Sequence, residues 1–364
     1  IHCAAGLTCV LSLVFTVLGL IMAPEFLRWI QTPADVLENA TAYLRLYLLS
    51  LISIVSYNMG SGILRALGNT KSPTLYQLAG GIANIIGNTL FICFLDWGVQ
   101  GAALATACSQ GLAAFLIIRH LCTIKTPYRL RLRQLQINAS ICGQFLLVGI
   151  PAAIQSIVIT LSNLIVQAHI NQLGIDSMAA FTAYFKVENF IYLPIMAFGQ
   201  ACSTFTSQNI GANQVDRAKQ GVKTSLFLGI TVTISASVLT LCFSDFAFGL
   251  FSKEPAVIAL GTKIAFVAYP FYFIYVFLEV YASAIRGAGK ALPAMLIVVI
   301  NMCVVRTCIL KVVLHFYPNA LGVAAIYPLT WACTGLCLFL YYKSGGWFSA
   351  QTDVARKRIS VGQR

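Results

Sequence analysis

The sequence predicts an all-α polytopic membrane protein built from two related helical lobes. Of its 364 residues, 59% are hydrophobic and only 10% are charged, whereas soluble domains carry about a quarter charged residues. Apolar runs of about 20 residues, the length that crosses a bilayer, recur along most of the chain. A basic, turn-forming stretch also returns about 220 residues later between two other apolar runs, as in a duplicated helical bundle.

The repeated stretch runs from Arg65 to Pro73 as RALGNTKSP and returns from Arg286 to Pro293 as RGAGKALP. Flanking residues recur in the same register: Pro33 with Pro255, Tyr47 with Tyr269, Gly68 with Gly289, and Gly98 with Gly322. We expect the two stretches to be equivalent cytoplasmic turns, each between the fourth and fifth helices of its lobe. Their expected role is orientation and turn geometry rather than substrate chemistry.

Ten membrane spans are expected in chain order. They lie near residues 4–23, 40–62, 74–95, 99–119, 142–170, 177–207, 222–243, 257–284, 292–313 and 321–342. Several are longer than a bilayer requires, so we expect tilt or extension into water. The predicted domains are a first lobe over 1–119 with four spans, a basic linker over 120–141, a second lobe over 142–343 with six spans, and a basic tail over 344–364.

Loop charges predict the orientation. Most of the 24 basic residues lie in alternate connections, including the linker, and in the tail, whereas most of the 11 acidic residues lie in the opposite connections. The basic side, with the C-terminus, is therefore expected in the cytoplasm. The net charge of +13 is explained by these loops, so we expect no nucleic-acid partner. Both repeats start from the cytoplasmic side with an even number of spans, which predicts a symmetry axis along the membrane normal.

The repeat register also predicts an N-terminally truncated chain. Ile1 aligns with the start of the third span of the second copy, near Lys223. The partners of the first two spans of that copy would lie about 80 residues before Ile1, so an intact protein would have about twelve spans, six per lobe.

Several motifs resemble the multidrug and toxin extrusion (MATE) family. Arg65–Pro73 resembles the loop between the fourth and fifth family helices, and Arg286–Gly289 resembles its second-lobe counterpart. GVQGAALAT from Gly98 resembles the entry to the sixth helix, and GIP ending at Pro151 resembles the start of the seventh. GQACSTFTSQNIGA from Gly199 resembles the end of the eighth helix. The resemblance covers essentially the whole chain, from the third to the twelfth helix.

The resemblance implies a secondary active antiporter. It would export organic cations or drugs across a bacterial cytoplasmic (inner) membrane, driven by inward H⁺ or Na⁺ through alternating access of the lobes. We expect a monomer with a small cationic substrate and no cofactor. Family pocket residues match Asn84 and Thr106, whereas a family Asp position holds Asn88, which cannot titrate.

Ionisable residues within the spans are the main site candidates. Glu188, Glu279, Arg306 and Lys186 lie well inside, where a charge is expensive, so they should face the bundle interior and pair. Glu188 is expected near the midplane, with Arg306 as a candidate partner, and it could alternate between a proton and a cationic substrate. Glu279 could line an inward-facing vestibule. The other reading is that these residues form ion pairs that lock helices together.

Neutral polar residues form a second candidate group, for which interhelical hydrogen bonds are the alternative role. They are Gln155, Asn163, Gln167, Asn189 and Gln200 in the second lobe, and Asn84 with Asn88 one turn apart in the first. Aromatic residues could line a cleft for flat cations, or could serve packing and lipid contact. The candidates are Tyr57, Tyr184, Tyr192 and Tyr275.

Three other functions are weighed against drug export. A flippase for a lipid-linked precursor would favour a cleft rich in Arg and Lys, whereas the spans hold few basic residues. A membrane-embedded enzyme would need a clustered catalytic set, and His2, His120, His169 and His315 do not lie at mid-membrane. We expect no enzyme, and ATP hydrolysis and zinc chemistry lack their motifs. The third alternative is an inert truncated fragment.

Overall fold

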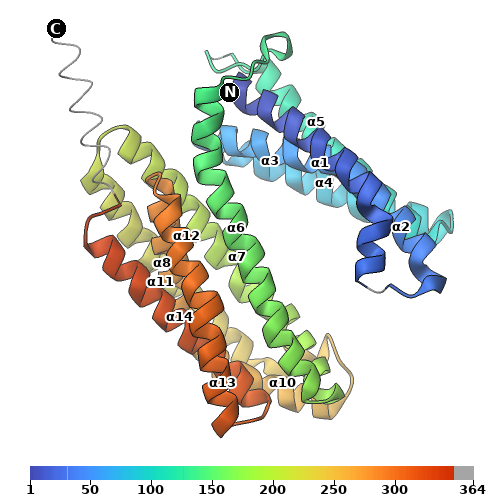
Figure 1. Ribbon diagram of the computed structural model, residues 1–364, viewed down its shortest axis with the longest axis vertical. Coiled ribbons are helices and arrows are strands. Elements are labelled where there is room, and N and C mark those ends of the chain that lie inside the picture. The colour runs from blue at the N-terminus through green and yellow to red at the C-terminus, as the bar shows by residue number, and fades with distance from the viewer. Residues whose placement is uncertain (31, 126, 348–364) are drawn as a thin grey trace. The chain divides into compact units, whose positions relative to one another are not determined.

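The computed structural model describes residues 1–30, 32–125 and 127–347, and these residues form helices joined by short turns (Figure 1). The first part of the chain forms α1 (His2–Trp29), α2 (Ala34–Leu49), α3 (Leu51–Ala66), α4 (Lys71–Asn88), η1 (Thr89–Phe94), α5 (Gly98–Thr123) and η2 (Leu132–Gln134). The remainder forms α6 (Ala139–Gln172), α7 (Ile175–Gly211), α8 (Val215–Cys242), α9 (Ser244–Gly249), α10 (Pro255–Ala268), η3 (Tyr269–Phe271), α11 (Tyr272–Gly287), α12 (Ala291–Val299), η4 (Ile300–Val305), α13 (Arg306–Phe316) and α14 (Ala320–Lys343).

Each of the ten expected spans falls on a helical segment. Within the described residues, nine continuous helical stretches are long and apolar enough to cross a membrane. The remaining expected span, 177–207, falls on α7, which is 37 residues long but is not among those nine. Its sequence carries Lys186, Glu188 and Asn189 close together, and these polar side chains lower its mean hydropathy. The predicted linker is partly helical at both ends, and most of the predicted tail lies outside the described residues.

The first compact unit runs from Ile1 to Phe145. Its small core contains Leu64, Ile117 and Leu121, all fully buried. Helices α4 and α5 pack closely, because a Cβ added at Gly80 would lie 3.1 Å from the carbonyl oxygen of Ser109. Helices in lipid associate by close packing through small residues, because burial of apolar surface contributes little free energy there.

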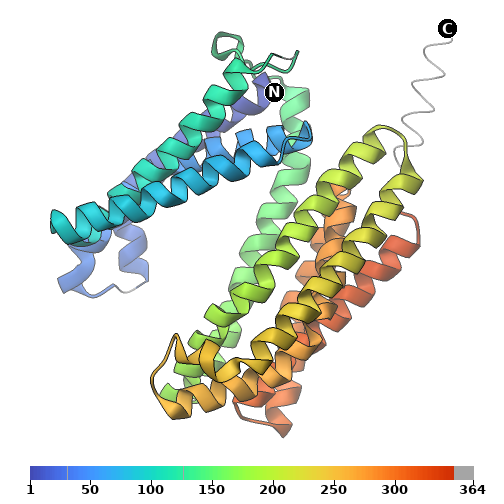
Figure 2. The same cartoon turned by 180° about the vertical axis from the view of Figure 1, so that it is seen from behind.

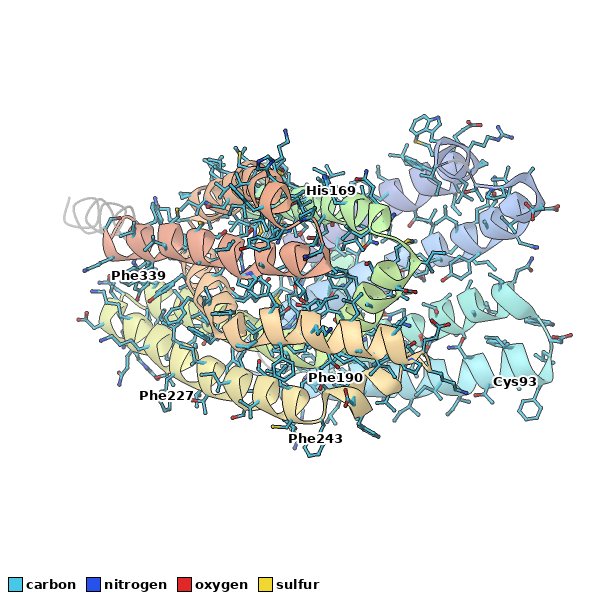
Figure 3. The ribbon with its side chains drawn as sticks, turned by 90° about the horizontal axis from the view of Figure 1, so that it is seen from below. Cys93, His169, Phe190, Phe227, Phe243 and Phe339 are labelled. Carbon is cyan, nitrogen blue, oxygen red and sulfur yellow. The ribbon has the colours of Figure 1, made fainter. Side chains whose placement is uncertain are left out.

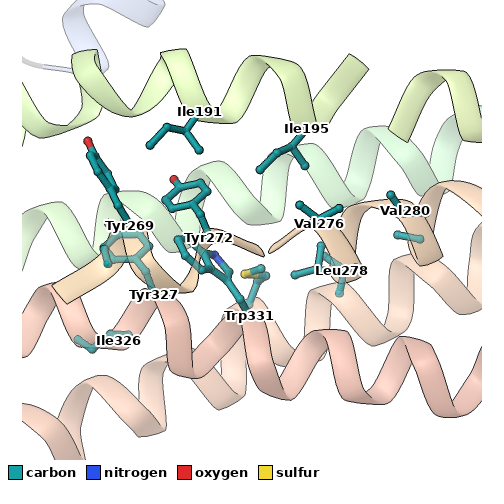
Figure 4. Close-up of a cluster of buried hydrophobic side chains, with 14 of the residues drawn as sticks. Ile191, Ile195, Tyr269, Tyr272, Val276, Leu278, Val280, Ile326, Tyr327 and Trp331 are labelled. Carbon is teal, nitrogen blue, oxygen red and sulfur yellow. The ribbon is translucent and has the colours of Figure 1, made fainter. Parts of the chain in front are cut away.

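The second compact unit begins at Leu146 and contains the larger core. Its helices, coloured from green to red, are seen from behind in Figure 2. Its buried side chains come mainly from α7, α10, α11 and α14. Figure 4 shows Tyr272 on α11 beside Tyr327 and Trp331 of α14. A Cβ added at Gly287 would lie only 2.5 Å from the carbonyl oxygen of Ser203, so α11 and α7 approach backbone to backbone there.

Large apolar side chains cover the outside of the second unit. Phe190, Phe227 and Phe243 are 68%, 71% and 59% exposed and point away from their helices (Figure 3). Exposed apolar surface of this extent is unfavourable in water but matches the hydrocarbon core of a bilayer. The exposed phenylalanines therefore belong to a membrane-embedded surface.

The two repeated turns have the same backbone geometry. Gly68 and Gly289 have φ angles of +86° and +83°, a left-handed conformation that glycine adopts without strain. Gly68 N donates to Arg65 O at 2.9 Å, and Gly289 N donates to Arg286 O at 2.9 Å. In each turn the next residue donates to an oxygen five residues earlier, Asn69 N to Leu64 O at 2.8 Å and Lys290 N to Ile285 O at 3.1 Å, as expected of a Schellman C-cap. The repeat detected in the sequence is thus a repeat of helix-ending geometry.

Candidate functional site

A cavity of about 470 Å³ lies inside the second unit. Its size is in the range of small-molecule sites. Each helix contributes residues at helical spacing, so each turns one stripe towards the cavity. The lining residues are Gln155, Ile159, Asn163 and Gln167 of α6; Phe185, Glu188, Asn189 and Tyr192 of α7; Tyr272, Tyr275, Leu278 and Glu279 of α11; Val298, Met302 and Arg306 of α12, η4 and α13; and Tyr327 and Trp331 of α14.

Glu188 is held by a tyrosine from the neighbouring helix. The hydroxyl of Tyr272 donates a hydrogen bond to Glu188 Oε1. The ring of Tyr272 packs edge-on against Trp331, with 4.6 Å between ring centroids, and the tyrosine is almost fully buried. The carboxylate is therefore oriented by a side chain that cannot easily move.

Arg306 is a buried cation with neutral hydrogen-bond partners. It is 4% exposed, and its Nη1 donates to Asn163 Oδ1 at 2.8 Å and to Ser162 Oγ at 3.4 Å. Its guanidinium lies 5.2 Å from the ring centroid of Tyr327, and its Nε has no hydrogen-bond partner in the part of the chain that the structure describes. Among the described residues, no carboxylate oxygen lies within about 4 Å of it, the usual limit for an ion pair.

Arg306 was a candidate partner of Glu188, and among the described residues the two side chains form no ion pair. Each side chain is instead hydrogen-bonded to neutral groups. The physical reason is that Tyr272 already occupies Glu188 Oε1, while Asn163 and Ser162 on α6 draw the Arg306 guanidinium towards that helix.

Glu279 is the partner of the repeated-turn arginine. Arg286 Nη2 lies 2.9 Å from Glu279 Oε1, and Ser283 Oγ donates to the same oxygen at 2.8 Å. Arg286 also donates to Ser283 Oγ at 2.8 Å, which closes a three-residue network. Glu279 is 7% exposed, so the network is largely shielded from solvent. The second turn is thus connected to a cavity-lining carboxylate, a link that its expected orientation role did not include.

Aromatic rings form one wall of the cavity. Trp331 packs against Tyr272 and Tyr275, with 5.4 Å between the Trp331 and Tyr275 centroids. Tyr275 in turn lies 5.7 Å from Tyr192, and Tyr327 lies 6.1 Å from Trp331. Four tyrosines were candidates for lining a cleft. Tyr192 and Tyr275 line the cavity, whereas Tyr184 belongs to the packed core and Tyr57 donates to Pro73 O.

The predicted first-lobe residues form a separate cluster within the first unit. Asn84 Nδ2 donates to Thr106 Oγ1 and to Ser109 Oγ, each at 3.4 Å. Asn88 Nδ2 donates to Asn84 Oδ1 at 3.1 Å within α4, and Asn88 Oδ1 is buried without a partner among the described residues. The two bonds donated by Asn84 join α4 to α5, so they are interhelical hydrogen bonds.

Two predicted residues lie away from the cavity. Gln200 is exposed on α7, about two helical turns beyond Tyr192, the last residue of α7 that lines the cavity. Lys186 was expected to face the bundle interior, but it is exposed and its ammonium lies 5.5 Å from the ring centroid of Phe251. Its four-carbon stem lets the charge lie over an aromatic ring on the outer surface.

Several cavity residues escaped the sequence analysis. Tyr272, Tyr327 and Trp331 were not singled out. Arg286, which pairs with the cavity-lining Glu279 but does not itself line the cavity, was assigned only to a turn. A signal existed for Tyr272: it lies seven residues before Glu279, which is two helical turns, and so shares its face. The spacing of Tyr327 and Trp331 carries less information, because α14 is apolar around most of its circumference.

The fold and the cavity define a multi-pass membrane transporter. The MatE family model matches residues 2–90 and 151–310. The chain belongs to this multidrug efflux family, as its sequence motifs predicted.

Curated relatives and solved structures agree. The chain is 28% identical over 349 residues to the probable multidrug resistance protein YpnP of Bacillus subtilis, covering 93% of this chain and 75% of that protein. It is 26% identical over 345 residues to the probable multidrug resistance protein YoeA of the same species, covering 92% and 74%. The fold matches the crystal structure of MATE in complex with MaL6, with a TM-score of 0.89 at 19% identity over 97% of this chain and 80% of that one.

Proposed function

We propose that this protein is a secondary active antiporter that exports organic cations or drugs, and that Glu188 is the residue that couples transport to an inward flow of H⁺ or Na⁺. The observation that carries the proposal is a carboxylate in an aromatic-walled cavity. Glu188 supplies a negative charge, and Tyr272, Tyr275 and Trp331 supply ring faces that attract a flat cation.

Exchange at one carboxylate gives antiport a simple mechanism. A bound H⁺ or Na⁺ neutralises Glu188, and a cationic substrate does the same, so the two compete for one charge. Neither lobe would then move with a bare buried charge, because an uncompensated ion in low dielectric is costly. Release of the coupling ion inside and release of the substrate outside complete the cycle.

The arrangement in the membrane belongs to the same proposal. The protein resides in the cytoplasmic membrane of a bacterium as a monomer, with the turns at Arg65 and Arg286 and the C-terminus in the cytoplasm. Two lobes, 1–119 and 142–343, joined by the basic linker 120–141, alternate access to the substrate. The charge difference between successive connections supports this orientation.

Ethidium efflux tests the proposal. The protein, expressed from its own gene in a pump-deficient bacterial strain, is expected to lower ethidium accumulation. Purified protein in proteoliposomes is expected to transport ethidium only when an inward H⁺ or Na⁺ gradient is applied. The two gradients, applied separately, identify the coupling ion.

Glu188→Gln is expected to abolish gradient-driven efflux while the protein still folds. Glu25→Gln is the matched control, because Glu25 is an exposed residue that pairs with Arg28 at 2.8 Å. Efflux by Glu188→Gln at the wild-type rate would remove Glu188 from the mechanism. Absence of gradient-driven transport of any cation tested would contradict the antiporter proposal itself.

A further inference from the structure

Arg306 places a permanent positive charge in the cavity with no negative partner in contact. Its described neighbours are an amide oxygen, a hydroxyl and an aromatic ring, all neutral. Arginine remains charged at any physiological pH, and a buried charge is stable only when paired or fully hydrogen-bonded. The unpartnered Nε shows that the hydrogen bonds of Arg306 are incomplete.

The two carboxylates that line the cavity do not supply the missing charge. Glu279 forms an ion pair with Arg286 and accepts a hydrogen bond from Ser283. Glu188 accepts from Tyr272 and makes no ion pair with Arg306 within the described part of the chain. The cavity thus presents a negative charge, Glu188 on α7, and a positive charge, Arg306 on α13, that do not pair with each other.

Helix clamping alone does not account for Arg306. The contacts with Ser162 and Asn163 do tie α13 to α6, but Ser162 also donates to the carbonyl oxygen of Met302, which already joins α6 to η4, the segment that leads directly into α13. A neutral glutamine could make comparable bonds to a hydroxyl and an amide without a buried charge. An arginine adds a planar set of N–H groups that matches a carboxylate in two parallel hydrogen bonds.

We propose that Arg306 binds a carboxylate of the substrate, so that the cavity selects zwitterionic aromatic compounds over simple organic cations. This inference rests on the proposed export function and narrows its substrate class. The amine or iminium of the substrate lies towards Glu188, its ring system lies against Tyr272, Tyr275 and Trp331, and its carboxylate lies at Arg306.

Charge balance explains the selectivity. A substrate with only a positive charge neutralises Glu188 but is repelled by Arg306, and it leaves the guanidinium without a partner. A zwitterion neutralises both protein charges and so enters without adding net charge to the cavity. Its two charges must be separated by a ring system, because the two protein groups are not in contact with each other.

A matched pair of dyes tests this selectivity. Rhodamine 6G is a planar cation whose carboxyl group is blocked as an ethyl ester, and its free acid is the corresponding zwitterion. Binding of each to the purified protein is measured by fluorescence polarisation. Wild-type protein is expected to bind the free acid about tenfold more tightly than the ester, which corresponds to one charge-assisted interaction.

Variants separate an anion-binding role from a structural role. Arg306→Gln is expected to weaken binding of the free acid about tenfold and to leave the ester unchanged or bound more tightly. Arg306→Lys keeps the charge but loses the planar fork, so an intermediate loss is expected for the acid. Arg45→Gln is the control, because Arg45 is a first-unit arginine that donates to the backbone oxygen of Leu20.

Two outcomes would overturn the inference. One is equal affinity of wild-type protein for the two dyes. The other is an equal loss of both dyes in Arg306→Gln and Arg306→Lys, since this is what a purely structural arginine would produce. The export function is judged separately by gradient-driven efflux of the ester: if the ester is exported without preference for the acid, only the zwitterion inference fails, whereas absence of both transport and binding removes both.

Discussion

Arg286 reaches back two helical turns to pair with Glu279, with 2.9 Å between Nη2 and Oε1. The corresponding arginine of the first repeat, Arg65, donates its Nε to the backbone oxygen of Ser61 instead. Seven residues before Arg65 stands Asn58, which donates to Ile54 O and carries no charge. The two turns have the same backbone geometry, but only the second connects its arginine to a residue that lines the cavity.

Loss of the Arg286 charge is expected to destabilise the second unit. Arg286→Gln leaves the buried Glu279 carboxylate without its counter-charge, at a cost of about 3 kcal/mol. Thermal unfolding of purified protein should show a clear fall in melting temperature. Arg65→Gln is the repeat-related control and should change it little. The double variant Glu279→Gln with Arg286→Gln should recover most of the loss, and failure to recover would show that the pair is not the cause.

Gly199 lies where α7 passes the same network. A Cβ at this position would lie 2.7 Å from Glu279 Oε1 and 3.1 Å from Ser283 Oγ. Gly199→Ala is therefore expected to cost about 1–3 kcal/mol and to slow transport, because Glu279 must move. Gly149→Ala in α6 meets nothing within 4 Å and serves as the control. Unchanged melting and transport in Gly199→Ala would show that Glu279 is freely mobile.

The hydroxyl of Tyr272 is expected to matter for substrate binding. Tyr272→Phe keeps the ring against Trp331 but removes the hydrogen bond to Glu188, which is worth about 1.5–3 kcal/mol when one partner is charged. We expect about a tenfold rise in the KM for ethidium efflux. Tyr269→Phe removes a buried hydrogen bond to Tyr184 O at 3.2 Å and should affect stability without affecting the KM. Equal KM values in the two variants would contradict a role for Tyr272 in orienting Glu188.

The ring of Trp331 is expected to contribute to ligand affinity directly. Trp331→Ala removes a ring that packs against Tyr272 and Tyr275, and a cation–ring contact in a desolvated site is worth about 2 kcal/mol. Polarisation titrations should therefore show affinity for rhodamine 6G at least about tenfold weaker. Trp29→Ala is the control, because Trp29 is 69% exposed on α1. If both variants bind the dye as well as wild type, the aromatic wall is not the binding surface.

The fold was largely predictable because bilayer constraints act on every residue of a span. Length and hydropathy placed ten helical segments, and the glycines at Gly68 and Gly289 marked helix ends that require a positive φ. The helices extend past the predicted spans, as α1 and α6 show, because a helix continues into water after the apolar run ends. Hydropathy alone could not locate such ends.

The candidate site was predictable in composition but not in its pairing. Glu188, Glu279 and Arg306 were identified because ionisable residues are rare within membrane spans, where each charge is energetically costly. The partners depended on which helix faces meet, which no single span encodes. One example is Glu188, which accepts a hydrogen bond from Tyr272 and makes no contact with Arg306 within the ion-pair limit. The exposed Lys186 is another, since a flexible stem can carry a charge to the surface from a position that looks interior.

The π-helical turn η4, Ile300–Val305, immediately precedes Arg306. A π turn holds one residue more than an α-helical turn, so it rotates everything after it by about 100° relative to a regular helix. If this turn closed into a regular α-helix without a change in length, Arg306 would rotate by about 100° and leave the cavity. A one-residue deletion, usually among the most damaging of genetic changes, would here restore a regular helix and leave Arg306 in place, because the π turn holds the residue that is lost. This turn can therefore lose a residue without displacing the positive charge of the cavity.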